Sequence, residues 1–352
     1  MSRRLTALVI PVFVAFALLT AACGDDGGSA SAESGADPVT LHLGYFANIT
    51  HGSPLVGIGN GTYAKTLGSN VTLNTSIFGA GTEEIEALFA GAIDAGYIGP
   101  NPAVNGYVKS NGEALRIVAG ATSGGAALVV KPDINGPQDL KGKVLATPSL
   151  GNTQDVALRA YLKDNGLSAD TSGGGDVSIH PQDNSQTLDA FKADTVQGAW
   201  VPEPWATRLV VEGGGKVLVD EATLWPEGKF ATTELIVSKK FLDAHPDVVK
   251  KLIEAQLETE KFIADNPDQA EQIANAEIEK ITGKKLADGV LGPAFKNLTF
   301  TNDPVASSVQ QSAEDAHDVG LLDSVPDLKG LFDLTILNEV LKANGQQPVA
   351  GL

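Results

Sequence analysis

The feature that most limits what this chain can fold into is a repeated junction between a strand and a helix. Short apolar runs of strand length lead through a polar turn that contains glycine or proline into a segment with helical periodicity. In the clearest example, residues 141–167, a strand is expected at 143–147 and a helix at 153–165 that stops at Gly166. Strands that alternate with helices in this way indicate an α/β fold.

A junction of this kind is also suited to holding an anion. The first turn of a helix has unpaired backbone N–H groups, and the positive end of the helix dipole points the same way. Ser149, Asn152 and Thr153 therefore lie where an anion can be held without lysine or arginine. The alternative is that Asn152 or Thr153 is an ordinary N-cap, as at most helix starts.

Three further junctions have similar chemistry. They occupy residues 45–51, 78–82 and 97–102, and Thr82 is the expected N-cap in the second of them. Open α/β sheets bind ligands beyond the carboxyl ends of their strands. Four polar turns of one kind therefore predict a shared cleft.

The periodicity gives a coarse element order. Strands are expected at 39–46, 71–78, 95–98, 115–121, 127–131, 143–147, 177–180, 197–201, 216–219 and 233–238. Helices are expected at 54–67, 83–90, 102–110, 153–165, 184–193, 203–212, 267–282, 303–319 and 333–343, with a further helical stripe over 241–257. The chain is almost wholly helical from Lys239 onward.

The N-terminal segment has the pattern of a secretory signal. Two arginines precede an apolar run that is short for a membrane span, and small residues follow. Cys23 is the only cysteine and follows a segment that resembles a bacterial lipobox, so we expect residues 1–22 to be removed and Cys23 to be lipidated. Residues 23–38 are small and polar and predict a flexible tether. A plain cleaved signal or a transmembrane anchor is the alternative.

Composition excludes several function classes. The net charge is −18, and removal of the two arginines of the signal makes it more negative, which argues against nucleic acid or anionic lipid surfaces as partners. Residues 24–352 contain no cysteine, so disulfides and thiolate metal sites are excluded there. The five histidines lack metal-ligand spacing, and no Gly-x-Ser-x-Gly elbow is present. No enzyme activity, cofactor or metal is therefore expected.

Several segments resemble the extracytoplasmic substrate-binding lipoproteins of ABC importers in the aliphatic sulfonate/taurine/nitrate family. They are GYFANITHGSPLVGIGNGTYAKTLG, EALFAGAIDAGYIGPNPAV, LKGKVLATPSLGNTQDVALRAYLKDNGL, GAWVPEPWATRLV and ELIVSKKFLDAHPDVVKKLIEA. The resemblance implies a type II periplasmic-binding-protein-like fold, in which two α/β lobes are joined by two crossover strands and close on the ligand. It places lobe 1 at 39–130 plus 237–352 and lobe 2 at 131–236, with crossovers at Val129-Val130 and Leu235-Ile236.

The resemblance also implies a role and partners. The expected function is to capture a small sulfonate-type organic anion, an alkanesulfonate or taurine, and deliver it to a membrane permease. The protein is expected to be a monomer, held on the outer face of the cell membrane by its lipid anchor. Nitrate, bicarbonate or a thiamine-precursor pyrimidine are the alternative ligands. A thiamine-precursor synthase-like enzyme on the same fold is a remote alternative, and a structural surface protein has no need of four polar turns.

Eleven residues are candidates for ligand binding. They are Tyr45, Asn48, His51, Gly81, Thr82 and Asn101 from lobe 1, and Asn152, Thr153, Trp200, Glu203 and Thr232 from lobe 2. A sulfonate or nitrate has three equivalent oxygens and no proton to donate, so it requires only donors. The backbone N–H groups of Gly81, Thr82 and Thr153 meet that requirement.

Three of these candidates leave alternatives open. Asn48 and His51 have the Asn-x-x-His spacing of the family's thiamine-precursor branch; a protonated His51 would add charge, and otherwise His51 caps the helix that follows it. Trp200 is favoured over Trp205 for packing on the organic part of the ligand, with a core position as its alternative. Glu203 would repel an anion unless it faces an amine or caps a helix, and a taurine-like zwitterion or a cationic ring answers that objection.

Overall fold

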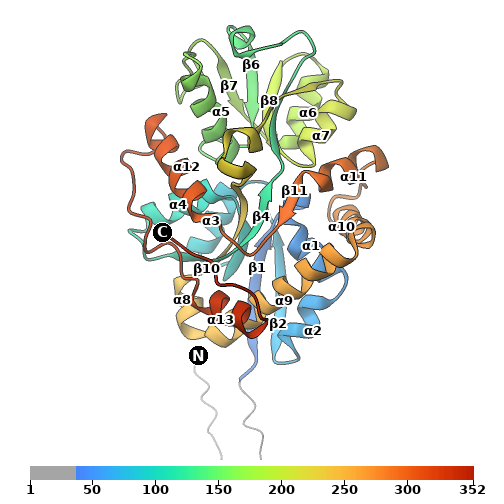
Figure 1. Cartoon of the computed structure of the whole chain (residues 1–352), viewed down its shortest axis with the longest axis vertical. Coiled ribbons are helices and arrows are strands. Elements are labelled where there is room, and N and C mark those ends of the chain that lie inside the picture. The colour runs from blue at the N-terminus through green and yellow to red at the C-terminus, as the bar shows by residue number, and fades with distance from the viewer. Residues whose placement is uncertain (1–36) are drawn as a thin grey trace, which may run out of the picture. The chain divides into compact units, whose positions relative to one another are not determined.

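The computed structural model describes residues 37–352, in which residues from Pro38 onward form two β-sheets with helices on their faces (Figure 1). The predicted signal, Cys23 and all but the end of the predicted tether lie outside the described residues. No helix among residues 37–352 has the length and apolar character that a membrane crossing requires.

The larger sheet has six strands in the order β11-β4-β10-β3-β1-β2. Its strands are β1 (Val39–Tyr45), β2 (Val71–Ile77), β3 (Ala95–Ile98), β4 (Leu115–Gly124), β10 (Ala231–Ser238) and β11 (Leu298–Phe300). β1 runs parallel to β2 and β3, whereas β10 is antiparallel to both β3 and β4. The late strand β10 thus lies inside the sheet, between β3 and β4.

Helices from both ends of the chain cover this sheet. The N-terminal ones are η1 (Ile49–His51), α1 (Gly52–Gly59), α2 (Thr62–Leu67), α3 (Gly81–Phe89) and α4 (Pro100–Lys109). The C-terminal ones are α8 (Lys239–Ala244), α9 (Pro246–Asp265), α10 (Pro267–Thr282), α11 (Asp288–Lys296), α12 (Ala306–Asp318) and α13 (Thr335–Ala343). One apolar core joins β1 to α1, α2, α9 and α10, and a second core lies under α3, α4 and α12.

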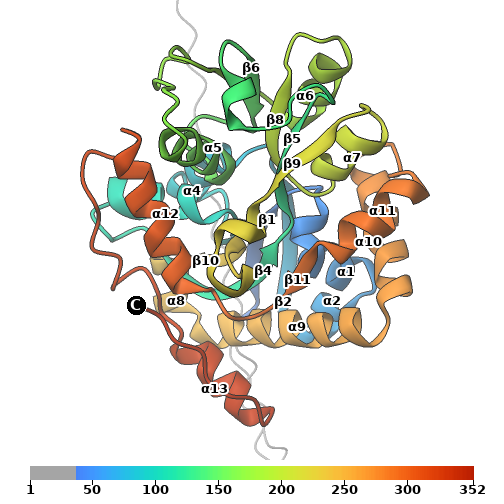
Figure 2. The ribbon, with the colours of Figure 1, turned by 45° about the horizontal axis from the view of Figure 1, so that its top comes forward.

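The smaller sheet has five strands in the order β7-β6-β8-β5-β9. Figure 2 labels β5, β6, β8 and β9 of this sheet. Its strands are β5 (Ala126–Val130), β6 (Val144–Thr147), β7 (Ser178–Pro181), β8 (Gly198–Pro202) and β9 (Lys216–Asp220). The associated helices are η2 (Pro137–Leu140), α5 (Thr153–Asp164), α6 (Asn184–Lys192), α7 (Trp205–Val211), η3 (Glu221–Leu224) and η4 (Pro226–Gly228). One apolar core contains α5, and the core on the other face contains α6 and α7.

The α/β fold class is confirmed, because the described residues form two mixed β-sheets with helices packed on their faces. The predicted crossover points are wrong. Val130 pairs with Gly198 inside the smaller sheet, and Leu235 pairs with Tyr97 inside the larger one. The chain changes sheet at Gly124-Gly125, where both residues have positive φ (82° and 73°), and again between β9 and β10. We therefore propose that lobe 1 comprises 38–124 plus 231–352 and that lobe 2 comprises 125–230.

Two local predictions also differ from the structure. The single helix expected at 54–67 is divided into α1 and α2 at Gly61, whose φ of 81° does not fit a helix. The short strand β11 and the helix α11 that precedes it were not expected. The three residues of β11 pair with the end of β4, a contact between distant parts of the chain that periodicity does not indicate.

Candidate ligand-binding site

A cavity of about 570 Å³ lies between the two sheets, and the starts of six helices line it. In lobe 1 they are the starts of η1–α1, α3 and α4, with Asn48, Gly81 and Gly99 at the wall. In lobe 2 they are the starts of α5, α6 and α7, which contribute Asn152-Thr153, Asp183-Asn184 and Pro204-Trp205. Backbone N–H groups and positive dipole ends therefore face this cavity from both lobes.

His51 is the main polar side chain of the lobe 1 wall. Its Nδ1 accepts a hydrogen bond from the backbone N–H of Phe46 (3.2 Å), and its ring stacks on Phe46 with centroids 4.3 Å apart. Burial lowers the pKa of His51 to about 3, so the imidazole is neutral at physiological pH. Since Nδ1 is an acceptor, Nε2 carries the proton and is a neutral donor. The hypothesis of a protonated His51 is thus corrected, and its side chain makes no cap bond to α1.

Asn48 lies beside it at the start of η1. Its Oδ1 accepts a hydrogen bond from the backbone N–H of Thr50 (3.3 Å), as an N-cap does. Within residues 37–352 its Nδ2 group has no hydrogen-bond partner. Asn48 therefore offers the cavity a second neutral donor.

The lobe 2 wall contains polar atoms that lack partners. Thr153 Oγ1 and Asn184 Oδ1 are buried, belong to the first residues of α5 and α6, and make no hydrogen bond within the described residues. Leaving such a group unpaired costs about 1–3 kcal/mol, so a ligand or water is expected there. Asn152 differs, because its Oδ1 caps α5 by accepting from Asp155 N (3.0 Å) and its Nδ2 donates to Gln154 (3.1 Å). The ordinary N-cap alternative thus holds for Asn152 and not for Thr153.

Basic side chains also reach the cavity wall, which the sequence did not predict. Arg208 is held by two hydrogen bonds to Glu212 (2.7 and 3.1 Å) and lies over the ring of Trp205. Lys284 and Lys285 come from the loop between α10 and α11, and both are exposed. The cavity wall therefore carries cationic groups beside the neutral donors, and also the carboxylates of Asp183 and Asp189.

The sequence pattern that defines the NMT1-like family matches residues 34–278, more than half of the chain. The chain belongs to the NMT1-like family. A Brucella abortus protein named as a binding protein is 26% identical over 263 residues, which are 71% of this chain and 78% of the relative. The taurine-binding periplasmic protein of Escherichia coli K12 is 29% identical over 207 residues, 59% of this chain and 62% of that protein.

Solved structures share the fold of this NMT1-like protein. The nitrate-binding protein NrtA of Synechocystis superposes with a TM-score of 0.70 at 17% identity, over 86% of this chain and 88% of that one. The alkanesulfonate-binding protein SsuA of Xanthomonas axonopodis superposes with a TM-score of 0.67 at 18% identity, over 83% and 96%. The type II periplasmic-binding-protein fold is thereby confirmed. These relatives are named as binding proteins and not as enzymes.

Six of the eleven predicted site residues of the NMT1-like protein line the cavity. They are Asn48, His51, Gly81, Asn152, Thr153 and Thr232. Only glycine fits at position 81, because a Cβ there would lie 2.5 Å from Pro102 Cγ. The hydroxyl of Thr232 donates to the carbonyl oxygen of Gly124 (2.6 Å) and so joins β10 to the sheet-changing segment.

In lobe 1 the structure corrects three predicted site residues. Tyr45 is buried in the apolar core with Leu41 and Leu43, because alternate residues of β1 share one face. Thr82 is exposed and is not the N-cap of α3; Glu83 accepts instead from the backbone N–H of Gly79 (3.2 Å).

Asn101, the third of these, faces away from the cavity. Its Oδ1 accepts from the hydroxyl of Ser312 on α12 (2.7 Å), and its Nδ2 donates to the backbone oxygen of the same residue (3.3 Å). Gly99 and Pro102 line the cavity in its place.

In lobe 2 the structure corrects two more. Trp200 is fully buried in the core and donates its Nε1–H to Glu221 (2.6 Å), whereas Trp205 lines the cavity. Glu203 is directed away, where it accepts from Thr207 and from Asn297 Nδ2 (2.7 Å), and burial raises its pKa. The objection that Glu203 would repel an anion is therefore removed.

The sequence reasoning also missed part of the wall. The start of α6 at Asp183-Asn184 follows β7 through a polar turn, the same pattern as the four junctions, and could have been included. The aromatic residues Phe46 and Phe78 lie within two of those junctions. The loop with Lys284 and Lys285 follows a helix rather than a strand, so no such signal existed for it.

Proposed function

We propose that this chain is the substrate-binding component of an ABC importer, which captures an alkanesulfonate or taurine between its lobes and delivers it to a membrane permease. The observation that carries the proposal is the meeting of six helix starts from two lobes at one cavity. Membership of the NMT1-like family and the names of the taurine-, nitrate- and alkanesulfonate-binding relatives support it.

The donor groups at the cavity suit an anion without protons, and the carboxylates of Asp183 and Asp189 line another part of its wall. Sulfonate oxygens only accept hydrogen bonds, and the wall offers donors at His51 Nε2, Asn48 Nδ2 and the hydroxyl of Thr153. Hydrogen bonds to a charged group contribute about 1.5–3 kcal/mol each. Four such bonds at the upper end of this range give about 12 kcal/mol, so micromolar affinity, about 8 kcal/mol, also requires a small association cost or packing of the alkyl part.

The size and lining of the cavity favour an organic anion over nitrate or bicarbonate. Its volume of about 570 Å³ falls in the range of sites for organic ligands. Phe46, Phe78 and Trp205 give it an aromatic part that a hydrated inorganic ion does not use. The alkyl part of a sulfonate packs on such rings.

A thiamine-precursor pyrimidine is the second candidate ligand. The observation that favours it is the stacked Phe46–His51 pair next to Asn48, since an aromatic platform with neutral donors and acceptors suits a heteroaromatic ring. The neutral state of His51 is compatible with this ligand as well as with a sulfonate.

Calorimetric titration of the purified chain from Gly24 onward separates these ligands. We expect binding of taurine or ethanesulfonate, with weaker or no binding of nitrate, bicarbonate and 4-amino-5-hydroxymethyl-2-methylpyrimidine. Ligand at 100 times its dissociation constant should add about 2.7 kcal/mol to the free energy of unfolding. Tight binding of the pyrimidine alone would replace the sulfonate assignment, and turnover of any of these compounds would contradict the receptor role.

The membrane attachment is a separate part of the proposal. We propose that the protein is extracytoplasmic and carries a lipid on Cys23, on the sequence pattern given above. Mass spectrometry of the protein extracted from its native membrane tests this. A mature N-terminus without diacylglyceryl on Cys23 would exclude the anchor and leave the ligand assignment unaffected.

A further inference from the structure

The turn between β6 and α5 forms part of the lobe 2 wall of the cavity. It joins Thr147, the last residue of β6, to Thr153, the first of α5, and Pro148, Asn152 and Thr153 line the cavity. A loop that holds a ligand by backbone N–H groups binds well only if its backbone is fixed before the ligand arrives.

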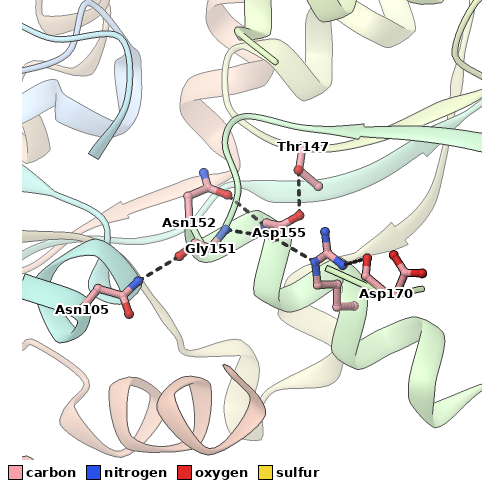
Figure 3. A network of polar contacts seen from close by, with 7 residues as sticks. Asn105, Thr147, Gly151, Asn152, Asp155 and Asp170 are labelled. Carbon is pink, nitrogen blue, oxygen red and sulfur yellow. Dashed lines mark hydrogen bonds and ion pairs between the residues drawn. The ribbon is translucent and has the colours of Figure 1, made fainter. Parts of the chain in front are cut away.

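One buried carboxylate fixes this turn from behind. Asp155 is fully buried and does not line the cavity. Its Oδ1 accepts from the hydroxyl of Thr147 (2.9 Å), and its Oδ2 accepts from the backbone N–H of Gly151 (2.9 Å) (Figure 3). Asp155 therefore ties the end of the strand and the turn to the first turn of the helix.

A residue of lobe 1 holds the same turn through the backbone carbonyl group of Gly151. Asn105 of α4 donates from Nδ2 to the carbonyl oxygen of Gly151 (3.3 Å). Gly151 has a φ of 72°, a backbone conformation that residues with a Cβ atom rarely adopt. The N–H and the carbonyl group of Gly151 are thus both bonded, one within lobe 2 and the other to α4 of lobe 1.

The charge of Asp155 would repel an anionic ligand at the start of α5, and Arg159 compensates this charge. A carboxylate in the first turn of a helix is favourable for the helix dipole, and for that reason it opposes a second anion at the same helix start. Arg159 lies one turn further along α5, is buried, and donates its Nε–H to Asp155 Oδ2 (2.9 Å). Its Nη1 also donates to the carbonyl oxygen of Asp170 (2.7 Å), which fixes the guanidinium in place.

We infer that Asp155 is a positioning residue for the ligand and that Arg159 cancels its charge, so that the start of α5 remains open to an anion. This inference rests on the proposed function, because it assumes an anionic ligand at Thr153. The inference gives Asp155 and Arg159 a role in ligand affinity, in addition to any contribution they make to the stability of α5.

Four variants of the purified chain test the inference, each titrated with ethanesulfonate by calorimetry and melted without ligand. Thr147→Val removes one hydrogen bond to Asp155 and leaves both charges, so affinity should fall about tenfold. Arg159→Gln leaves the carboxylate uncompensated, and affinity should fall by more than tenfold. Asp155→Asn/Arg159→Gln removes both charges and should regain part of that loss. Leu162→Ala is the control: Leu162 packs in the apolar core under α5, so its truncation should lower the melting temperature and leave ligand affinity unchanged.

The comparison of affinity with melting temperature separates positioning from plain stability. If the pair only stabilises α5, the affinity of all four variants will follow their melting temperatures, and Leu162→Ala will lose affinity in proportion to its lost stability. That result would overturn the inference, as would wild-type affinity in Thr147→Val.

A readout without ligand keeps this test distinct from the proposed function. Amide hydrogen exchange of the ligand-free Thr147→Val protein should increase in residues 149–154 and not elsewhere in lobe 2. Unchanged exchange in that turn contradicts the positioning role even if the wild type binds ethanesulfonate. Increased exchange in a protein that binds none of the sulfonates supports positioning of the turn and contradicts only the proposed ligand.

Discussion

The hydroxyl of Thr153, the first residue of α5, is buried at the cavity and has no partner among residues 37–352. Thr82 lies near the start of α3 and is exposed outside the cavity. The two threonines therefore form a natural pair for comparison.

Thr153→Val should weaken ethanesulfonate binding by tenfold or more, because it removes one donor to a charged group. It should not lower the melting temperature, since the hydroxyl has no bond within the described residues to lose. Thr82→Val should change neither quantity. Calorimetry and thermal melting of both variants check this, and equal affinity of Thr153→Val and the wild type would remove Thr153 from the site.

His51 gives a pH prediction. Burial lowers its pKa to about 3 in the folded protein, below the ordinary value of 6.5. The unfolded chain therefore binds the proton more readily, and the contribution of His51 to stability is complete above pH 6.5 and is lost as the pH falls towards 3.

The stability difference between the wild type and His51→Gln should thus decrease by up to about 1.4 kcal/mol per pH unit below pH 6.5. Ligand affinity of the wild type should stay constant from pH 8 to pH 5, because His51 remains neutral. Denaturant titrations and calorimetry at several pH values measure both quantities. A loss of affinity centred near pH 6.5 would mean that His51 titrates normally.

At the scale of elements, the helix starts explain why the site could be partly predicted. A strand, a polar turn and a helix in sequence are local signals, so the starts of α1, α3, α4 and α5 were found from the residues alone. The direction of a single side chain is not a local property. Asn101 is turned from the cavity by Ser312, which lies 211 residues away in the sequence.

The loop between α10 and α11 gives a prediction about association rate. Lys284 and Lys285 lie at the mouth of a cavity in a chain whose net charge of −18 repels anions. Lys284→Gln/Lys285→Gln should lower the association rate of ethanesulfonate about two- to fivefold at low salt, and added salt should then raise the rate, because it screens the remaining negative charge.

Stopped-flow fluorescence checks this, with Trp205 at the cavity wall as the reporter. Lys240→Gln/Lys250→Gln makes the same change of charge at exposed positions outside the cavity and is the control. An equal effect of the two double variants would show that only net charge matters.

The helices and strands could likewise be predicted where the signal is local in the sequence, and not where it depends on contacts between distant residues. Strands and helices with strong apolar periodicity were predicted to within a few residues, as with β3 and α10. The crossovers were misplaced because β5 and β10 are long apolar runs, and only the positive φ of Gly124 and Gly125 decides where one sheet ends. The pairing of β11 with β4 depends on contacts that are not local.

At the scale of the whole molecule, the proposed function requires that the two lobes approach closely around the ligand. The backbone of Gly99 in lobe 1 lies against Thr153 in lobe 2, where a Cβ at position 99 would be 2.7 Å from Thr153 Oγ1. Asn105 bonds Gly151 and Asn297 bonds Glu203 across the same boundary. Chain segments near Gly124-Gly125 and between β9 and β10 join the lobes and are where a hinge would lie.

Gly99→Ala should therefore hold the lobes apart. We expect about tenfold weaker ethanesulfonate binding with a melting temperature near that of the wild type, since Gly99 has an ordinary φ of −68°. Small-angle scattering with ligand should give a larger radius of gyration for the variant than for the wild type. Wild-type affinity in Gly99→Ala would mean that this approach is not needed for binding.

The most direct test of the central claim is a crystal structure of the protein with bound ethanesulfonate, in which anomalous scattering locates the sulfur atom. We expect the sulfur between the two lobes, with sulfonate oxygens within hydrogen-bond distance of the N–H or hydroxyl of Thr153 and of His51 Nε2. A sulfur atom outside this cavity, or bound only by Lys284 and Lys285 at its mouth, would contradict the claim that the helix starts hold the ligand.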